Sequence, residues 1–268
     1  MRRFSCPARA FLALACLGLL AAAASAQSRD FGRGRTRRVE PTEAAHAVGL
    51  EVGLRVFGAA PTGVGFDLGG FGNDADYSDL FHTGVGSGLL AYLPIHVVEP
   101  GVRAFEVTIG PLLAVDRVTY GGADFTDGVG ARIEPDDMSI TRILAGFHVR
   151  LRVGGAEAPV RFLFGAQIGI GAAFIDKVDA DLFFPGPLPG TLYDATSTVA
   201  FELLVRPGIS IQLAPRVSLA LMVVLGFDVI GAPENADGPT NPIAPADAGP
   251  ILDGIFGVAA TVTIRFPA

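Results

Sequence analysis

The chain has 268 residues, a length that suits a single all-β barrel domain. Half of its residues are hydrophobic, yet no run beyond residue 26 is long and apolar enough for a membrane helix, a combination typical of β-barrel membrane proteins. The net charge of −7 argues against a nucleic-acid partner.

Residues 1–26 are predicted to form a signal peptide that is cleaved from the mature protein. Three arginines precede an apolar segment at 11–24, and Ala24-Ser25-Ala26 supplies the small residues expected before a cleavage site. The alternative is a permanent membrane anchor, but the apolar segment is short for a bilayer span. Both cysteines lie in this region, so the mature chain is expected to have no disulfide. Its net charge becomes −10, from 17 basic and 27 acidic residues.

Residues 27–46 are predicted to form a flexible, basic arm ahead of the barrel. The segment is polar, contains five arginines and shows no hydrophobic periodicity. A functional alternative is contact between these arginines and anionic lipid headgroups or cell-wall polymer.

The remainder, 47–268, is predicted to be an eight-stranded, antiparallel, up-and-down transmembrane β-barrel. Eight segments alternate large apolar residues with glycine, small or charged ones, as expected for strands. In the clearest of them, Phe147 and Val149 alternate with His148 and Arg150. The predicted strands are 48–57, 83–97, 103–118, 141–153, 160–174, 197–213, 217–230 and 251–266.

The apolar face of each strand is predicted to point outward, into lipid. A period of two leaves one alternative open, a soluble ligand-binding barrel with its apolar face inward. Eight strands enclose an interior that side chains or one small ligand already fill, so the apolar side chains of all eight strands would overfill it. A soluble barrel would also expose a glycine-rich surface with a single lysine, Lys177, to solvate it.

The connections between the predicted strands alternate between short and long. The short ones are 98–102, 154–159 and 214–216, and the long ones are 59–82, 119–138, 175–196 and 231–250. The long connections contain sixteen of the 27 acidic residues and only two basic ones, Arg132 and Lys177. Phenylalanines of the apolar face gather near both strand ends, which predicts two interfacial girdles. They are Phe105, Phe162 and Phe266 at the short-turn end, and Phe174, Phe201, Phe227 and Phe256 at the other.

Over about 48–266 the chain resembles the small eight-stranded outer-membrane barrels of the OmpA/OmpX type, in strand number, alternating connections and an aromatic near the end of the last strand. The resemblance implies a monomer in the bacterial outer membrane, with membrane lipid and lipopolysaccharide as partners. The short turns and the 27–46 arm would then lie in the periplasm, and the acidic loops could bind divalent cations. The family pattern ends on a terminal aromatic, whereas here Phe266 is followed by Pro267-Ala268.

The inward face is predicted to hold a network of paired charges that plugs the lumen, because buried charge is costly unless it is paired and hydrogen-bonded. Arg152 and Arg161 are expected to face each other near the short turns, with a carboxylate such as Glu51 or Glu106, or water, between them. An ion path or gate is the functional alternative to a plug. The predicted members are Glu51, Arg55, Glu106, Asp116, Arg142, His148, Arg150, Arg152, Arg161, Gln167, Glu202, Arg206, Asp228 and Arg265.

No catalytic constellation, cofactor site or metal site is predicted, because no histidine has a second histidine or a cysteine at ligand spacing. Three functions remain. The first is a structural barrel, or one that binds surface partners through its loops. The second is a narrow, porin-like barrel for small molecules. The third is a barrel that hydrolyses lipid A or peptides, using His148, or His82 with Asp79. The apolar loop at 182–193 is expected either to contact a partner or membrane, or to cap the barrel.

Overall fold

The computed structural model describes residues 48–63, 66–67, 74–98, 105–126, 130, 132–154, 158–183, 186–214, 216–234, 236, 241 and 248–266. The predicted signal peptide and basic arm lie outside these residues. Within them, no helix has the length and hydrophobicity needed to cross a membrane.

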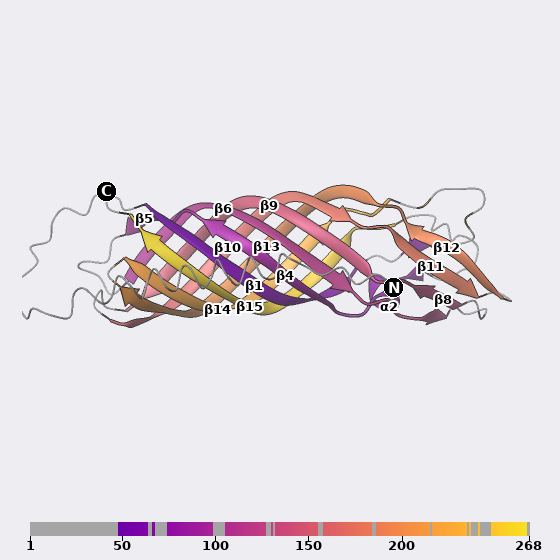
Figure 1. Ribbon diagram of the computed structural model, residues 1–268, viewed down its shortest axis with the longest axis horizontal. Helices are drawn as coiled ribbons and strands as arrows, with labels where there is room; N and C mark the ends of the chain where they lie inside the picture. Colours follow the sequence, from indigo (N-terminus) through magenta and orange to yellow (C-terminus); the bar gives the residue numbers. More distant parts are fainter. Residues whose placement is uncertain are drawn as a thin grey trace, which may run out of the picture.

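Eight long antiparallel strands close into a barrel, which confirms the predicted fold (Figure 1). The first strand pairs with the last along 14 residues, and every strand of the wall has a neighbour on each side. The wall strands are β1 (Gly49–Thr62), β4 (Gly84–Tyr92), β6 (Phe105–Tyr120), β9 (Met138–Val153), β10 (Val160–Ile175), β13 (Thr196–Ala214), β14 (Val217–Ile230) and β15 (Ile251–Arg265).

Two predicted strands differ from the observed ones by more than three residues at an end or by an interruption. The segment predicted to end at Phe57 continues to Thr62, because β1 stays paired with β15 after its side chains become small. The segment predicted at 83–97 is interrupted at Leu93-Pro94, and its remainder forms β5 (Ile95–Val98). Proline has no N–H for the ladder. The bend remains attached on both sides, since the Leu93 N–H donates to Pro111 and the Pro94 carbonyl accepts from Gly49, both at 3.1 Å.

The apolar face points outward on all eight strands, as predicted. Its side chains are exposed all around the barrel. The most exposed of them are Val85 on β4, at 70 %, and Phe162 on β10, at 74 %. Phe162 and Phe266 near the short turns, and Phe174, Phe227 and Phe256 near the long connections, lie on this outer face. An apolar wall between two rings of aromatics is the exterior of a transmembrane barrel.

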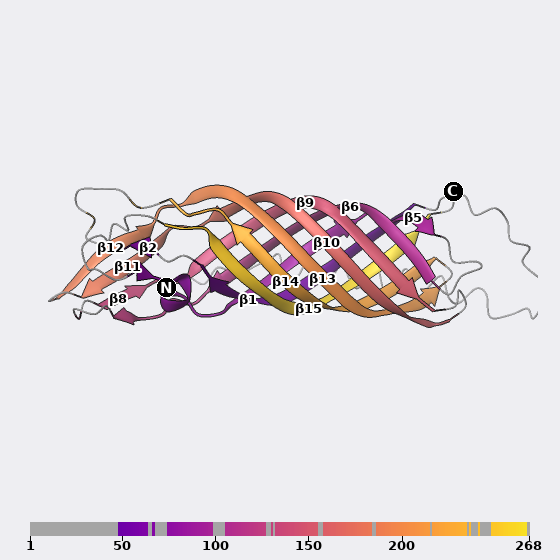
Figure 2. The ribbon, with the colours of Figure 1, turned by 180° about the vertical axis from the view of Figure 1, so that it is seen from behind.

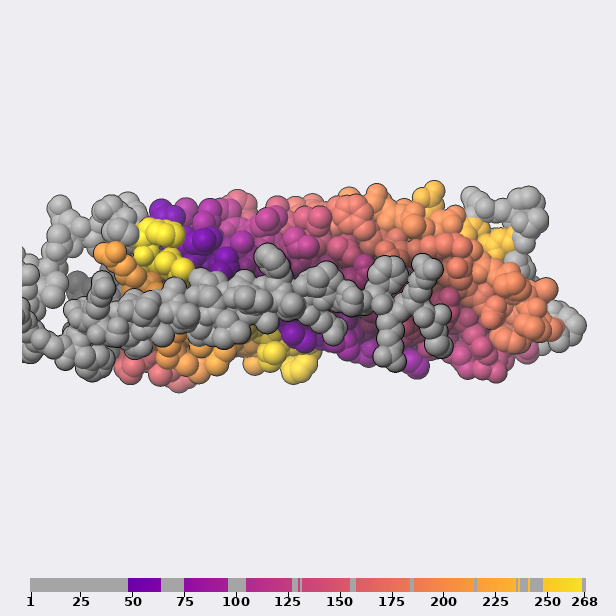
Figure 3. Space-filling view, viewed as in Figure 1, coloured from indigo at the N-terminus to yellow at the C-terminus, as the bar shows by residue number. Residues whose placement is uncertain are grey.

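The long connections contain elements that the sequence pattern did not reveal. The first holds β2 (Phe66–Asp67), β3 (Asp74–Ala75) and the one-turn helix α2 (Tyr77–Leu80). The second and third form a separate sheet in the order β12-β11-β8-β7, beyond one rim of the barrel (Figures 1 and 2). Its strands are β7 (Phe125–Thr126), β8 (Arg132–Pro135), β11 (Val178–Phe183) and β12 (Pro187–Tyr193). In the space-filling view, the orange surface of β11 and β12 lies at that end of the molecule (Figure 3).

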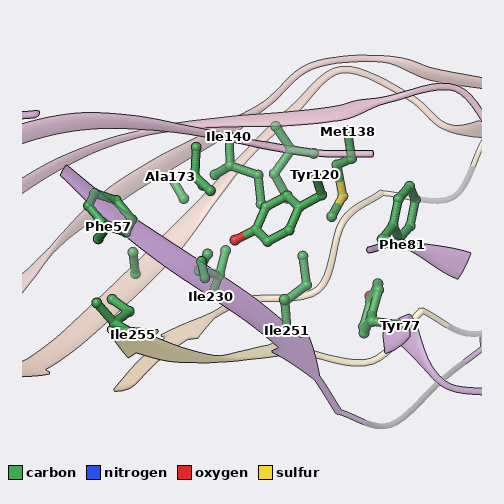
Figure 4. Close-up of a cluster of buried hydrophobic side chains, with 14 of the residues drawn as sticks. Phe57, Tyr77, Phe81, Tyr120, Met138, Ile140, Ala173, Ile230, Ile251 and Ile255 are labelled. Atoms are coloured by element: carbon green, nitrogen blue, oxygen red, sulfur yellow. The ribbon is translucent and has the colours of Figure 1, made fainter. Parts of the chain in front are cut away.

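The half of the lumen nearest the long connections is packed with apolar side chains, although glycine, alanine and charge were expected there. Tyr120 lies at the centre of this cluster, among Met138, Ile140 and Ile230 (Figure 4). Tyr77 of α2 packs over the same cluster from the loop side (Figure 4). The prediction was incomplete because large inward residues such as Ile140 lie beyond the ends of the clearest alternating segments. This apolar cluster closes the lumen at the rim.

Candidate functional site: the filled lumen and the acidic sheet

Below the apolar cluster, five charged side chains meet across the lumen in what we call the mid-barrel cluster: Arg55, Asp116, Arg142, Glu202 and Asp228. Arg55 pairs with Asp116 and, at 2.6 Å, with Glu202. Arg142 pairs with Asp228 and with Asp116 at 2.6 Å, so Asp116 bridges the two arginines. All five are buried, and they come from β1, β6, β9, β13 and β14. The cluster therefore ties five of the eight strands together through charge-assisted hydrogen bonds.

The ring of Phe57 separates this cluster from the apolar half. The guanidinium carbons of Arg55 and Arg142 lie 5.2 and 5.3 Å from its centroid, within the range of cation–π attraction. Gly86 makes room for the ring, since a Cβ at that position would press against the ring carbons, with Phe57 Cε1 at 2.9 Å. Gln167 completes the cluster by donating to Glu202.

A second group of charges, the lower cluster, lies toward the short turns. Arg150 forms a bidentate pair with Glu51, which also accepts a hydrogen bond from the Thr263 hydroxyl at 2.8 Å. Glu106 is shared by three arginines, with nitrogen–oxygen distances of 3.0 Å to Arg152 and 3.3 Å to Arg161 and Arg265.

Arg152 and Arg161 are not directly opposite each other, which corrects the expectation. The pairing of β9 with β10 places Leu163 opposite Arg152, so Arg161 lies diagonally, nearer the mouth. The connection between these strands is longer than a tight hairpin turn, and this shifts the register. Glu106 lies between the two guanidinium groups.

Arg206 and His148 lie beside the lower cluster and contact each other. The Arg206 Nη2 atom is 3.0 Å from His148 Nδ1 and 3.2 Å from His148 Nε2. The imidazole also packs on Tyr92, with ring centroids 4.4 Å apart, and Tyr92 lies 5.5 Å from the Arg150 guanidinium carbon. Every predicted lumen residue is thus inside the barrel, as two clusters and the Arg206–His148 pair rather than as one network. Tyr92, Tyr120 and Asp253 were not predicted as members, although all three stand at inward positions of the alternation.

The residues considered for hydrolysis are not assembled for it. His148 is 1 % exposed and lies against Arg206 in the lumen. His82 is exposed, but the Asp79 carboxylate accepts a hydrogen bond from the backbone N–H of Asp76 at the start of α2. Among the side chains that the structure describes, no group of three or more histidine, aspartate or glutamate residues could hold a metal ion.

The four-stranded sheet beyond the rim carries four carboxylates on one side, which we call the acidic face: Glu134, Asp136, Asp179 and Asp181. Asp181 is directly opposite Glu134, and the Asp136 N–H donates to the Asp179 carbonyl at 2.8 Å. Like charges directly opposite each other destabilise a sheet. A cleft of about 370 Å³ lies on this face, bounded on its far side by Pro189 and Thr191 of β12.

Two cations partly offset the acidic face. Lys177 lies 2.7 Å from Asp179, and the hydrogen bond that it donates holds the pKa of that carboxyl below its usual value. Arg132 lies 2.5 Å from Glu134. Within the described residues, no cation pairs with Asp136 or Asp181.

The apolar loop at 182–193 is largely a hairpin of β11 and β12. Its inner side is buried, including Leu182, Leu192 and Tyr193, and burial raises the pKa of the Tyr193 phenol well above its ordinary value. Leu188, at the tip, is 46 % exposed. The edge of β12 is covered at Thr191, whose N–H and carbonyl both bond to the Asn241 side chain at 3.2 and 2.8 Å.

Comparison with known proteins finds similar solved structures only. No family model matches the chain, and no curated protein matches it significantly. Neisserial surface protein A is 14 % identical with a TM-score of 0.36, over 82 % of this chain and 97 % of its own. Ail, the attachment invasion locus protein of Yersinia pestis, is 10 % identical with a TM-score of 0.30, over 82 % and 99 %. The outer membrane protein OprG of Pseudomonas aeruginosa is 11 % identical with a TM-score of 0.33, over 84 % and 99 %.

The assignment of this chain to the small eight-stranded barrels rests on its own strand pairing. A particular set of features is typical of proteins of the bacterial outer membrane. These proteins are barrels with an even number of antiparallel strands and an apolar band between aromatic girdles, with short turns at one end and long loops at the other. This chain has each of these features, and the outer membrane is where it lies.

Proposed function

We propose that this outer-membrane barrel does not conduct solutes and instead presents its acidic face at the cell surface to bind a cationic partner. The proposal rests on the four carboxylates that lie side by side on a sheet beyond the barrel rim. Self-repulsion within such an array is relieved when a polycation approaches, and complementary charge speeds the encounter.

The rigidity of the platform supports this proposal. Glu134, Asp179 and Asp181 belong to hydrogen-bonded strands, and the backbone N–H of Asp136 donates to Asp179. The edge of β12 is covered by Asn241. A surface that is already ordered loses little conformational entropy when it binds.

The filled lumen supports the non-conducting part of the proposal. A solute would have to cross the lower cluster, the mid-barrel cluster and the apolar cluster under α2 in turn. Planar-bilayer recordings of the purified barrel are expected to show no channels. Steady single-channel conductance would favour the narrow-pore alternative instead.

Binding can be tested with fluorescent polylysine and the purified protein in an uncharged detergent. Asp136→Asn with Asp181→Asn should weaken binding by about tenfold, or about 1.4 kcal/mol, because neither carboxylate forms an ion pair with a cation among the described residues. The matched control, Asp194→Asn with Glu234→Gln, removes two exposed charges outside the acidic face and should have a smaller effect. Equal losses in both variants would show attraction to net charge rather than to this face.

A further inference from the structure

Arg206 is a buried cation without an acidic partner, a feature that the surface-binding function does not use. Its side chain comes from β13 and is 1 % exposed. Within the described structure, its Nη2 atom contacts the ring of His148, and its Nε and Nη1 atoms have no hydrogen-bond partner. Arginine stays protonated inside proteins, and a neutral imidazole supplies no negative charge. Among the described residues, no carboxylate therefore lies within ion-pairing distance of the Arg206 guanidinium.

The neighbouring carboxylates are already engaged. Glu202 is on the same strand, but it accepts from Arg55 and Gln167 and lies four residues away, about 13 Å along the strand. Leu204 is the inward residue between them. Both oxygens of Glu51 are held by Arg150. In the described structure, Glu202 and Glu51 are thus oriented toward other side chains and form no ion pair with Arg206.

The surroundings of Arg206 attract anions. Arg206 and Arg150 are the partners of Gly165 on its two sides, so two cationic strand positions flank a residue with no side chain. Between this row and the mouth, Arg152, Arg161 and Arg265 converge on the carboxylate of Glu106. Their side-chain exposure falls from 19 % at Arg265 to 7 % at Arg161 and 4 % at Arg152. An anion that enters from the periplasmic end would therefore meet one arginine after another, each more buried than the last.

We propose that Arg206 binds a small inorganic anion of the halide class in the periplasmic half of the lumen. A buried charge is expensive unless it is paired, and an anion would supply the missing charge and accept from the two unpartnered nitrogens. The ligand must be small because the ring of His148 lies over Gly165, its Nε2 atom 2.8 Å from where a Cβ would stand. Above the site, the mid-barrel cluster has three carboxylates for two arginines, which repels an anion. The site is a dead end, not part of a conduction path.

The first test measures the thermal unfolding of the purified barrel in an uncharged detergent. Sodium chloride or bromide replaces sodium gluconate at constant ionic strength, so the cation and the ionic strength stay the same and only the anion changes. The midpoint should rise by about 2–4 °C and then saturate, as for a ligand that binds only the folded state. Arg206→Met should abolish this rise, whereas Arg216→Met, at an exposed arginine in a short turn, should preserve it.

The second test is anomalous diffraction from wild-type crystals soaked in bromide, which does not depend on a variant that folds. A bromide peak within hydrogen-bonding distance of the Arg206 guanidinium is expected. An equal halide response in Arg206→Met and the wild type would overturn the proposal, as would an anomalous map with no bromide at Arg206. Neither result would affect the proposed function of the acidic face, which lies at the other end of the barrel.

Discussion

The substitution Glu51→Gln tests whether buried charges in this lumen are stabilised by one-to-one pairing. The glutamine keeps the size of the side chain but removes its charge, and its amide NH₂ would point at an arginine. Arg150 has no other carboxylate partner among the described residues, so it would become a buried, uncompensated cation. Breaking a buried pair from one side in this way costs about 3–5 kcal/mol of unfolding free energy.

The comparison is with Asp116→Asn in the mid-barrel cluster. There Arg55 keeps Glu202 and Arg142 keeps Asp228, and the cluster changes from three carboxylates and two arginines to two of each. Only hydrogen-bonding geometry is lost, so the expected loss is about 1–3 kcal/mol. Although Asp116 contacts two arginines and Glu51 contacts one, the substitution at Glu51 should be the more damaging.

The assay is urea unfolding of the barrel in detergent micelles, followed by circular dichroism and by heat-dependent gel migration. With a urea dependence of about 1–3 kcal/mol per molar, Glu51→Gln should lower the midpoint by more than about 1 M. The double variant Glu51→Gln with Arg150→Met should recover most of the loss, because it removes the orphaned charge. A larger loss for Asp116→Asn than for Glu51→Gln, or no recovery in the double variant, would refute the reasoning.

Three further predictions concern the wall, the packing and the acidic face. Val149→Arg, at a 43 % exposed position on the lipid side, should cost about 2–4 kcal/mol in lipid vesicles, whereas a polar wall facing solvent would tolerate it. Gly86→Ala should cost about 1–3 kcal/mol in the urea assay because its methyl group would overlap the Phe57 ring, and Phe57→Leu should relieve part of that loss if the clash is the cause. Lys177→Met should raise the pKa of Asp179, since the hydrogen bond from Lys177 holds it down; an unchanged carboxyl titration by NMR would contradict this.

The architecture was predictable because each of its signals is local. Alternation along 217–230 gave the same bounds as β14, and the burial of Arg150 against the exposure of Val149 follows from a period of two. The interruption at Leu93-Pro94 also has a local cause, the missing N–H of proline, yet the alternation continues across it and conceals it. The sheet formed by β8 and β11 was not predictable in the same way, because its strands belong to different connections and each is short.

The sequence by itself determined the number of strands, the face that each turns to lipid and the inward position of every predicted lumen charge. These follow from the period of a strand and the lengths of its connections. Only the tertiary structure decided which charges meet. Glu51 and Arg150 are 99 residues apart, Arg55 and Asp116 are 61 apart, and their contact depends on strand register and barrel closure. The pairing of β8 with β11 brings four carboxylates onto one face. Strand register in the wall leaves Arg206 without an ion-pair partner among the described residues, although its residue type and inward position are those of Arg142, which has two.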